Sequence, residues 1–312
     1  MDGCVAERRS RIVCVGGANV DRKARAFETI RFRESNPVSV SRTGGGVAGN
    51  IAANLTQLGV HTTLLTVVGD DPEGVWLVEE MRRRGIDTES IVRLPGERTG
   101  SYTAVLDHTG EMALALADMH IFDRFGVEML ERRWDLLAAS DAVVMDTNVS
   151  AELLSYAIER CGTERIPLCI NPVSAIKAKK LPKRLSGVEM LAANRAEAEA
   201  LTGVEIAAVD DAYRAAERLL AAGVGRAVVT MGAEGVVWAD RSGSGRLRSP
   251  VVPVVDVTGA GDALMSGVIY GIARRAALEE ACRWGVNAAA LTVQSERTVT
   301  SISAEQIGAN AI

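Results

Sequence analysis

The chain has 312 residues, of which 47% are hydrophobic and 24% are charged, and its formal net charge is −5 at pH 7. A chain of this length and apolar content can bury a substantial core, so we expect residues 1–312 to form a single domain. The net negative charge gives no overall attraction for nucleic acid, and no apolar run is long enough to predict a membrane span. We therefore expect neither nucleic acid nor a membrane as a partner.

The cysteines, the histidines and the N-terminus argue against further classes of protein. The five cysteines include no CxxC pair, which favours buried free thiols over disulfides or a zinc site. The three histidines do not stand at ligand spacing, so catalysis by histidine is disfavoured. The first residues, MDGCVAERRSR, lack the hydrophobic core of a signal peptide, which predicts a cytoplasmic protein.

Short runs rich in Val, Ile and Leu alternate with amphipathic segments along the chain. The runs are predicted strands at residues 11–17, 62–69, 142–148, 166–172, 188–194 and 226–232. The amphipathic segments are predicted helices at residues 47–58, 74–85 and 211–223. Buried strands that alternate with helices indicate an α/β fold with a doubly wound, mostly parallel sheet flanked by helices.

Two segments, residues 23–43 and 98–118, do not fit this alternation. The second contains YTAVLD, then HTG, then EMALALAD, which predicts a hairpin with its turn near residues 107–110. We expect the two segments to form a small antiparallel β-lid over one end of the main sheet.

Polar side chains gather where the predicted strands end. In an open parallel sheet the ligand binds beyond the carboxyl ends of the strands, so we expect these side chains to share one crevice. Amide and carboxylate groups with few aromatic side chains suit a small polyhydroxylated ligand. Turn and helix-cap roles remain the alternative for any single Asn or Asp. The residues concerned are Asn19, Asp21, Asp70, Asp146, Asn148, Asn171, Asn194 and Thr230.

A first glycine-rich run, TGGGVAGN at residues 43–50, opens a predicted helix. Consecutive glycines allow positive φ angles and let the backbone approach a ligand closely. Asn50 then lies one turn inside the helix and faces the same end. The alternative is a hinge for the lid followed by an ordinary helix start.

A second glycine-rich run, VDVTGAGDALMSG at residues 255–267, also leads into a predicted helix. The backbone N–H groups of Thr258 to Gly261 and the helix dipole attract an anion without a lysine. The run is neither a Walker A loop nor a GxGxxG fingerprint. Asp262 would repel a phosphate here unless it takes a proton from an attacking hydroxyl, although a plain helix N-terminal carboxylate is an alternative. Phosphoryl transfer accounts for both features, because it needs positioned charge and one base.

DVTGAGDALMSG and GGGVAGNIAANLTQLG resemble the two signatures of the ribokinase-like family of carbohydrate and nucleoside kinases. NRAEAEALTG at 194–203 and TMGAEGVV at 230–237 resemble two further stretches of that family in order and spacing, so the likeness covers about residues 11 to 303. The resemblance implies a ribokinase-like α/β sandwich, a β-lid through which two copies form a homodimer, ATP as phosphoryl donor, and Mg²⁺.

The resemblance also implies roles for individual residues. Asp262 would be the catalytic base, and Gly259, Ala260 and Gly261 would form the anion hole. Glu197 would hold Mg²⁺ through water, and Asp256 would lie near a monovalent cation such as K⁺. The nucleotide site would include Asn194, Thr230, Gly232, Gly235, Thr258, Gly259, Gly261 and Asn287.

Within this family, residues 16–21, 35–52, 96–119 and 170–181 resemble the pseudouridine kinases, which implies that the acceptor is the 5′-hydroxyl of pseudouridine. The acceptor would contact Asn19, Asp21, Gly45, Gly46, Asn50, Ser101, Tyr102, Asp118, Asn148 and Asn171.

Two departures from the pseudouridine kinase pattern leave the acceptor open. Gly49 stands where Arg is usual, and Asn171 stands where Asp is usual. The alternatives are a kinase for uridine, cytidine or inosine, a kinase for a free sugar such as ribose, and a nucleotide-binding sensor without catalysis. A dinucleotide-dependent oxidoreductase is disfavoured, because GGANVD follows the first strand in place of GxGxxG. Lys177, Lys179 and Lys180 are predicted to be solvated surface side chains rather than ligand contacts.

Overall fold

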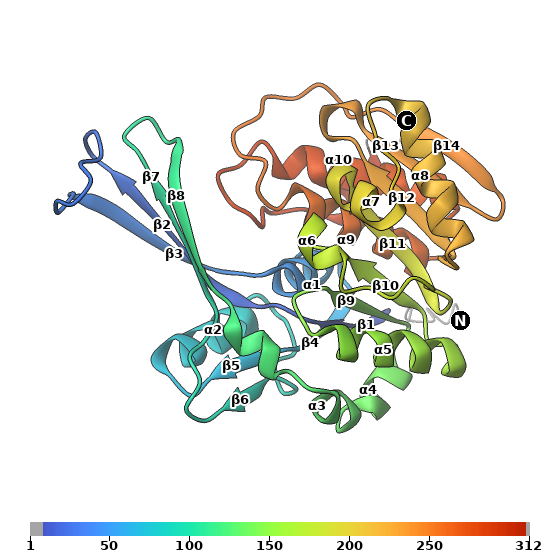
Figure 1. The fold of residues 1–312 in the computed structure, drawn as a ribbon, viewed down its shortest axis with the longest axis horizontal. Coiled ribbons are helices and arrows are strands. Elements are labelled where there is room, and N and C mark those ends of the chain that lie inside the picture. The colour runs from blue at the N-terminus through green and yellow to red at the C-terminus, as the bar shows by residue number, and fades with distance from the viewer. Residues whose placement is uncertain (1–8, 310–312) are drawn as a thin grey trace, which may run out of the picture.

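The computed structural model describes residues 9–309, which form three β-sheets and their covering helices (Figure 1). The main sheet has eight strands in the order β14-β13-β12-β11-β10-β9-β1-β4. Six strands run parallel, and β13 and β14 pair antiparallel at one edge. The strands are β1 Arg11–Val15, β4 His61–Leu65, β9 Ala142–Asp146, β10 Leu168–Asn171, β11 Val188–Asn194, β12 Arg226–Thr230, β13 Val236–Asp240 and β14 Gly243–Leu247.

Helices cover both faces of the main sheet, because alternate residues of its strands point into two separate cores. In β1, Val13 and Val15 belong to one core, whereas Ile12 and Cys14 belong to the other. The helices on the first face are α3 Val127–Glu131, α4 Trp134–Ala138, α5 Ala151–Glu164, α7 Arg195–Thr202 and α8 Val209–Ala221. The helices on the second face are α1 Val47–Gln57, α2 Pro72–Arg83, α9 Ala260–Ala273, α10 Leu278–Thr292 and α11 Ala304–Ala309.

The predicted doubly wound α/β sheet is confirmed, but one predicted strand is wrong. Residues 62–69 do not form one strand, because β4 ends at Leu65. The Thr66 hydroxyl donates a hydrogen bond to the Gly16 carbonyl at 2.6 Å, and the chain then leaves the main sheet. Residues Val67–Gly69 form β5, which pairs in parallel with β6, Val92–Leu94, in a separate two-stranded sheet.

The predicted helices are found with shifted bounds. Residues 74–85 were expected to be helical, whereas α2 spans Pro72–Arg83, because the Asp71 carboxylate accepts the Gly74 N–H at 2.7 Å and caps the helix two residues earlier. None of the helices within residues 9–309 combines the length and the apolarity that a membrane span requires. Cys4 lies outside the described residues, and the other four cysteines are buried free thiols.

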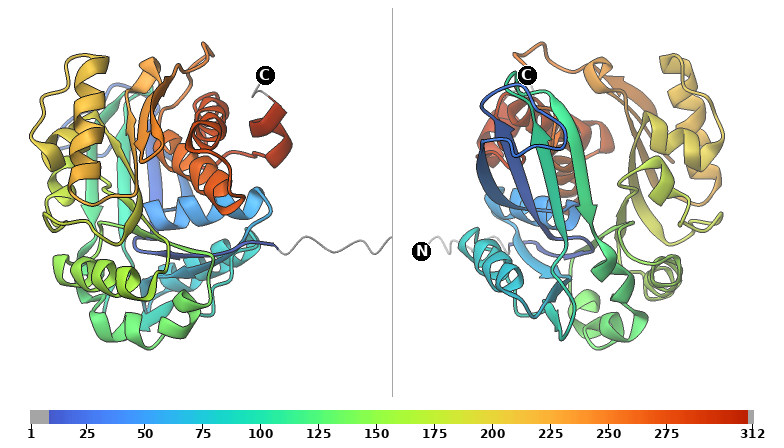
Figure 2. Two further views of the ribbon diagram at one scale, coloured as in Figure 1. Left: turned by 90° about the vertical axis from the view of Figure 1, so that its right-hand side faces the viewer. Right: turned by 60° about the vertical axis from the view of Figure 1, so that its left-hand side comes forward.

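The lid is a four-stranded sheet that projects beside the main sheet (Figure 2). Its strand order is β3-β2-β7-β8, and the inner strands β2 and β7 run parallel. The lid is therefore a mixed sheet and not the purely antiparallel one that we expected. Each predicted segment forms its own antiparallel hairpin, and the parallel pair joins the two hairpins. The strands are β2 Asn19–Ala26, β3 Val38–Gly45, β7 Ser101–Leu106 and β8 Met112–Asp118.

Candidate active site

The candidate site lies at the carboxyl ends of β9, β10, β11 and β12, where the N-termini of α1 and α9 meet the lid. Close contacts with the segment after β1 position the N-terminus of α1. Gly46 caps α1 with φ = 87°, and a Cβ there would lie 2.4 Å from the Gly17 carbonyl oxygen. A Cβ on Gly45 would lie 1.9 Å from the Asp21 carboxylate. Glycine is required at both positions, so the first glycine-rich run packs directly against the segment after β1.

Asp146, the last residue of β9, joins these two segments. Its buried carboxylate accepts hydrogen bonds from the backbone N–H groups of Gly17 at 2.9 Å, Ala48 at 3.0 Å and Asn148 at 2.8 Å. Burial raises the pKa of Asp146 above its ordinary value, and the three N–H donors oppose this shift. Asp146 therefore fixes the floor of the site and has little capacity left to contact a ligand.

Asp262 lies in the first turn of α9 and is only 9% exposed. The Asn50 amide of α1 donates a hydrogen bond to Asp262 Oδ2 at 2.9 Å. Burial raises the pKa of Asp262 to about 7, and the negative charges of Asp146, Glu197 and Asp21 add to this shift against the Asn50 hydrogen bond. A carboxyl group with this pKa can take up a proton and release it near neutral pH, as a general base must.

The Asn50 side chain also carries an unpaired hydrogen-bond acceptor. Its amide oxygen Oδ1 is buried and has no hydrogen-bond partner within the described residues. Because an unpaired buried acceptor is costly, a ligand hydroxyl or a water in the site is expected to donate to it.

A cavity of about 160 Å³ opens beside Asp262. Asn194 begins α7 in a capping box with Glu197: the Asn194 Oδ1 atom accepts the Glu197 N–H at 3.0 Å, and the Glu197 carboxylate accepts the Asn194 N–H at 2.9 Å. Burial raises the pKa of Glu197. The polar lining of this cavity brings together seven of the predicted residues, which are Asn171, Asn194, Glu197, Thr230, Gly259, Gly261 and Asp262.

A larger and mostly apolar cavity of about 400 Å³ adjoins the first, and the two share Thr230, Gly261 and Leu264. Its volume and apolar walls suit a nucleobase and its sugar. The predicted residues Thr230, Gly232, Gly235, Ala260 and Gly261 line it, together with valine and alanine side chains that the sequence did not single out, including Val251, Val252, Val254, Val257, Val286, Ala289, Ala290 and Val293.

Two predicted nucleotide-site residues, Asn287 and Thr258, line neither cavity. The buried Asn287 amide donates to the Ile307 carbonyl at 2.7 Å, which ties α10 to α11. The exposed Thr258 hydroxyl donates to the Asp256 carboxylate at 2.6 Å. Both side chains support the loops and helices around the cavity rather than its surface.

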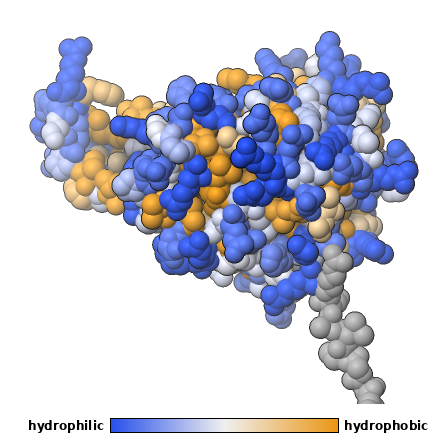
Figure 3. Space-filling model, turned by 90° about the horizontal axis from the view of Figure 1, so that it is seen from below, coloured by the Kyte–Doolittle hydropathy of each residue, from blue (hydrophilic) through white to orange (hydrophobic). Residues whose placement is uncertain are grey.

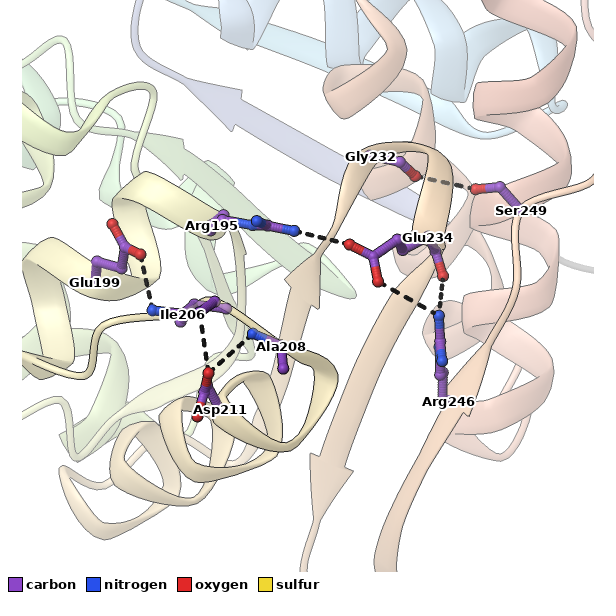
Figure 4. A network of polar contacts seen from close by, with 10 residues as sticks. Arg195, Glu199, Ile206, Ala208, Asp211, Gly232, Glu234, Arg246 and Ser249 are labelled. Atoms are coloured by element: carbon purple, nitrogen blue, oxygen red, sulfur yellow. Dashed lines mark hydrogen bonds and ion pairs between the residues drawn. The ribbon is translucent and has the colours of Figure 1, made fainter.

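A network of charged side chains holds the rim of the larger cavity (Figure 4). Glu234, in the turn between β12 and β13, forms ion pairs with Arg195 of α7 at 2.9 Å and with Arg246 of β14 at 3.8 Å. In the same turn the Gly232 carbonyl accepts the Ser249 hydroxyl at 3.2 Å. These contacts connect the turn to α7 and to the segment after β14.

On the lid side, Asn19 and Asp21 of β2 form a polar pair. The Asn19 amide donates to Asp21 Oδ1 at 2.6 Å, and burial raises the pKa of Asp21 to about 6. Tyr102 pairs with Asp21 across the sheet, so both lie on the inner face of the lid. Ser101 and Asp118 pair with each other on the opposite face, so the register does not place their side chains beside Asp21 as we expected.

The prediction of solvated surface lysines is wrong for Lys177 and Lys180. Lys177 lies in the short helix α6, Ala175–Ala178, and its ammonium donates to Asn148 Oδ1 at 2.6 Å. Burial lowers the pKa of Lys177. Lys180 donates to the Val149 carbonyl at 2.9 Å, whereas Lys179 is exposed as expected. The sequence does not reveal these contacts, because they depend on α6 folding back over the segment after β9.

No group of three or more His, Cys, Asp or Glu side chains in the described part of the chain is arranged to hold a metal ion. Glu197 alone borders the smaller cavity beside Asp262 as a further carboxylate. A single carboxylate fits Mg²⁺, which keeps most of its water shell and takes its other ligands from phosphates.

A helix start with backbone N–H groups, a buried carboxyl group and an adjoining apolar cavity together suit a phosphotransferase of the α/β class. The pfkB family carbohydrate kinase model matches residues 9–305, so the chain belongs to that family. It is an ATP-dependent kinase that acts on a sugar or a nucleoside.

Two relatives and one solved structure show which kinases this chain is similar to. The pseudouridine kinase of Escherichia coli (strain K12) is 36% identical over 258 residues, which are 82% of each chain. The guanosine-inosine kinase of Exiguobacterium acetylicum is 29% identical over 92% of this chain and 95% of its own. The structure of a carbohydrate kinase from Agrobacterium tumefaciens superposes with a TM-score of 0.84 at 34% identity, over 96% of both chains.

Proposed function

We propose that the protein transfers the γ-phosphoryl group of ATP to the 5′-hydroxyl of pseudouridine. The observation that carries the proposal is the buried Asp262–Asn50 pair beside the polar cavity, where that cavity meets the larger apolar one. The nucleotide base and ribose would occupy the larger cavity, and the phosphates would reach the start of α9. The acceptor would enter from the lid side, between Asn19 and Asp21 of β2 and the segment after β9.

In the reaction, Asp262 takes the proton from the 5′-hydroxyl. Its Oδ2 atom is occupied by Asn50, so Oδ1 is free to accept this proton. The 5′-oxygen then bonds to the γ-phosphorus while the bond from that phosphorus to the oxygen shared with the β-phosphate breaks, and ADP leaves. The backbone N–H groups of Gly259, Ala260 and Gly261 stabilise the charge that spreads over the transferred group. Mg²⁺, held through water near Glu197, would neutralise the phosphate oxygens.

The choice of pseudouridine rests on the relative that is 36% identical and on the Lys177–Asn148 pair. The Lys177 ammonium keeps two N–H donors, and the Asn148 amide nitrogen adds another. A Cβ on Gly17 would lie 2.6 Å from this nitrogen, so glycine there leaves room for the Asn148 side chain. A uracil ring presents carbonyl acceptors to such donors, and its C-linked form has one more ring N–H than uridine.

An acceptor screen tests the proposal. ATP consumption is measured with pseudouridine, uridine, cytidine, inosine, guanosine, ribose and fructose, and Asp262→Asn serves as the control for contaminating kinases. We expect the highest kcat/KM with pseudouridine. Turnover of inosine, guanosine or ribose without turnover of pseudouridine would reject the acceptor but keep the kinase. No turnover of any acceptor would favour a nucleotide-binding sensor.

A purine nucleoside is the second candidate acceptor. The guanosine-inosine kinase matches more of this chain than the pseudouridine kinase does, although at lower identity. Gly49 and Asn171 also depart from the pattern of the pseudouridine kinases. The same screen separates the two acceptors.

We further propose that two copies associate through the outer face of the lid, which carries apolar side chains (Figure 3). Cross-strand register places Val40, Leu114 and Leu116 on the face opposite Asp21, and Val40 is 62% exposed. The whole of β8 is exposed and forms an unpaired edge. A soluble protein rarely leaves a projecting apolar sheet face uncovered, and a second lid has the matching surface.

A further inference from the structure

Lys23, on the inner face of the lid strand β2, contacts a loop of the main domain. Its ammonium forms an ion pair with Asp256 Oδ2 at 2.8 Å and lies 3.5 Å from the Glu296 carbonyl oxygen. The contact joins residues 233 positions apart, and both side chains are partly buried, at 36% and 26% exposure. It is a direct polar link between the lid and the segment that leads into α9.

Asp256 extends this link to the proposed anion hole. While Oδ2 holds Lys23, its Oδ1 atom accepts the Thr258 N–H at 2.8 Å and the Thr258 hydroxyl at 2.6 Å. These bonds fix the backbone immediately before Gly259, which caps α9 with φ = 83°. The position of Lys23 is therefore coupled through one carboxylate to the N–H groups that would face the phosphate.

The segment around Glu296 packs against the same backbone. The Val255 N–H donates to the Val293 carbonyl at 2.7 Å, and a Cβ on Gly259 would lie 2.1 Å from the Thr298 carbonyl oxygen. The ammonium of Lys23 thus sits where three segments meet, which are the lid, residues 255–261 and residues 293–298. Its two oxygen neighbours, a carboxylate and a carbonyl, are the kinds of ligand that a hard cation takes.

The sequence resemblance placed a monovalent cation near Asp256, whereas the structure shows an ammonium of the same chain at that carboxylate. We propose that Lys23 is a positioning residue whose ammonium replaces a monovalent cation at Asp256 and so holds the anion hole in register when the lid covers the site. This inference rests on the proposed kinase function of the Asp262 site. The positive charge that orders residues 255–261 would then be supplied by the lid itself.

Two measurements test the proposal, and one of them needs no turnover. The affinity for ADP is measured calorimetrically, and kcat/KM for ATP is measured with the best acceptor, each in tetramethylammonium chloride and in KCl at equal ionic strength. For the wild type we expect less than about a twofold difference between the salts in either quantity, because the ammonium is already present. For Lys23→Met, we expect both quantities to fall about tenfold in tetramethylammonium and to recover at least about threefold in KCl.

Matched variants separate this role from a structural one. Arg25→Met removes a positive charge from the same face of β2, two residues further on, where the side chain donates a hydrogen bond to the His108 carbonyl at 3.3 Å. It should match the wild type in both salts. Lys23→Arg keeps the charge and should remain independent of K⁺, whereas Lys23→Met with Asp256→Asn should lose the recovery by K⁺.

Two outcomes would overturn the proposal. One is a wild-type enzyme that gains about fivefold or more from K⁺, and the other is a Lys23→Met variant that matches Arg25→Met in both salts. If no acceptor is phosphorylated, the kinase assignment fails, yet the salt dependence of ADP affinity still decides whether Lys23 acts as the cation. A Lys23→Met chain that does not fold leaves Lys23→Arg and the wild-type salt comparison to decide the question.

Discussion

Two regions form the candidate site. One is the carboxyl end of the main sheet with the start of α9, which we call the sheet edge, and the other is the lid, and the two hold their polar groups differently. At the sheet edge, Asp146 and Asp262 are buried and fixed by short hydrogen bonds from backbone and amide groups. The lid is attached by partly exposed charge pairs, Lys23 to Asp256 on its inner face and Arg22 to Glu73 on its outer face. Burial raises the pKa values of both carboxyl groups, of which Asp262 is the proposed base and Asp146 a structural acceptor, whereas the partly exposed pairs attach the lid to the main domain.

The largest effect is expected from Asp262→Asn, which removes the base but keeps the shape and a hydrogen-bonding side chain. We expect kcat to fall about 10²–10⁴-fold while ADP affinity stays within about threefold, because general base catalysis contributes that much. Steady-state assays and calorimetry measure the two quantities. A kcat within a few fold of the wild type would show that the buried sheet edge is not where the proton is removed.

The raised pKa of Asp262 predicts how activity depends on pH. The deprotonated carboxylate is the active form, so kcat/KM should rise about tenfold per pH unit below about pH 7 and level off above it. A profile that is flat from pH 5 to 8 would contradict this assignment. Asp262→Asn should remove the rise from whatever activity remains.

The same shift predicts an opposite effect on stability. The folded state keeps the Asp262 proton up to about pH 7, whereas the unfolded carboxyl releases it near the ordinary value of 3.8. The folded state therefore binds more protons between these values, and the contribution of Asp262 to the free energy of unfolding falls as the pH rises from 4 to 7. Denaturant titrations should show Asp262→Asn gaining stability over the wild type as the pH rises through this range.

A smaller effect is expected from Lys177→Met, which should change the KM for the acceptor but not the KM for ATP. Losing a partly buried charged donor should raise the KM for the acceptor about tenfold or more and leave the KM for ATP unchanged. The matched control is Lys179→Met, which removes an exposed lysine two residues away in the same segment. Equal acceptor KM values in the two variants would exclude Lys177 from acceptor binding.

Changing the outer face of the lid should alter assembly more than catalysis. Leu116→Lys places a charge on an apolar side chain that is 59% exposed. We expect sedimentation to show a dimer for the wild type and a monomer for the variant, with kcat reduced by no more than about threefold. A wild type that is monomeric at micromolar concentration would reject the proposed dimer.

The smallest effect is expected at the rim of the nucleotide cavity. Glu234→Gln breaks the ion pairs to Arg195 and Arg246, but all three side chains are substantially exposed. Such pairs contribute little, so the KM for ATP should change less than about threefold. A larger increase would mean that this network, like the buried sheet edge, fixes the geometry of the site.

The sequence predicted features that depend on local pattern. The glycine-rich runs, Asn50 and Asp262 were identified because spacing within one segment places them at helix starts, and the structure brings the two side chains within 2.9 Å. The alternation of apolar runs likewise predicted the main sheet. The role of Asp146 as acceptor for two separate segments was not predicted, because its partners Gly17 and Ala48 lie about a hundred residues or more away.

The missed features are contacts between distant segments. Lys177 and Lys180 have no local signal that distinguishes them from the exposed Lys179. The Lys23–Asp256 pair depends on where the lid comes to lie, and the parallel pairing of β2 with β7 depends on the register between two hairpins. A single sequence carries little information on such long-range geometry.

The parallel junction between β2 and β7 has a consequence for how the molecule is made. The first hairpin leaves the ribosome long before the second, so the inner edge of β2 stays unpaired until the chain has been synthesised past residue 106. Until then that edge is open to pairing with other nascent chains. Moving acceptor selectivity from one such enzyme to another would likewise require both hairpins to be exchanged together, because each completes the sheet of the other.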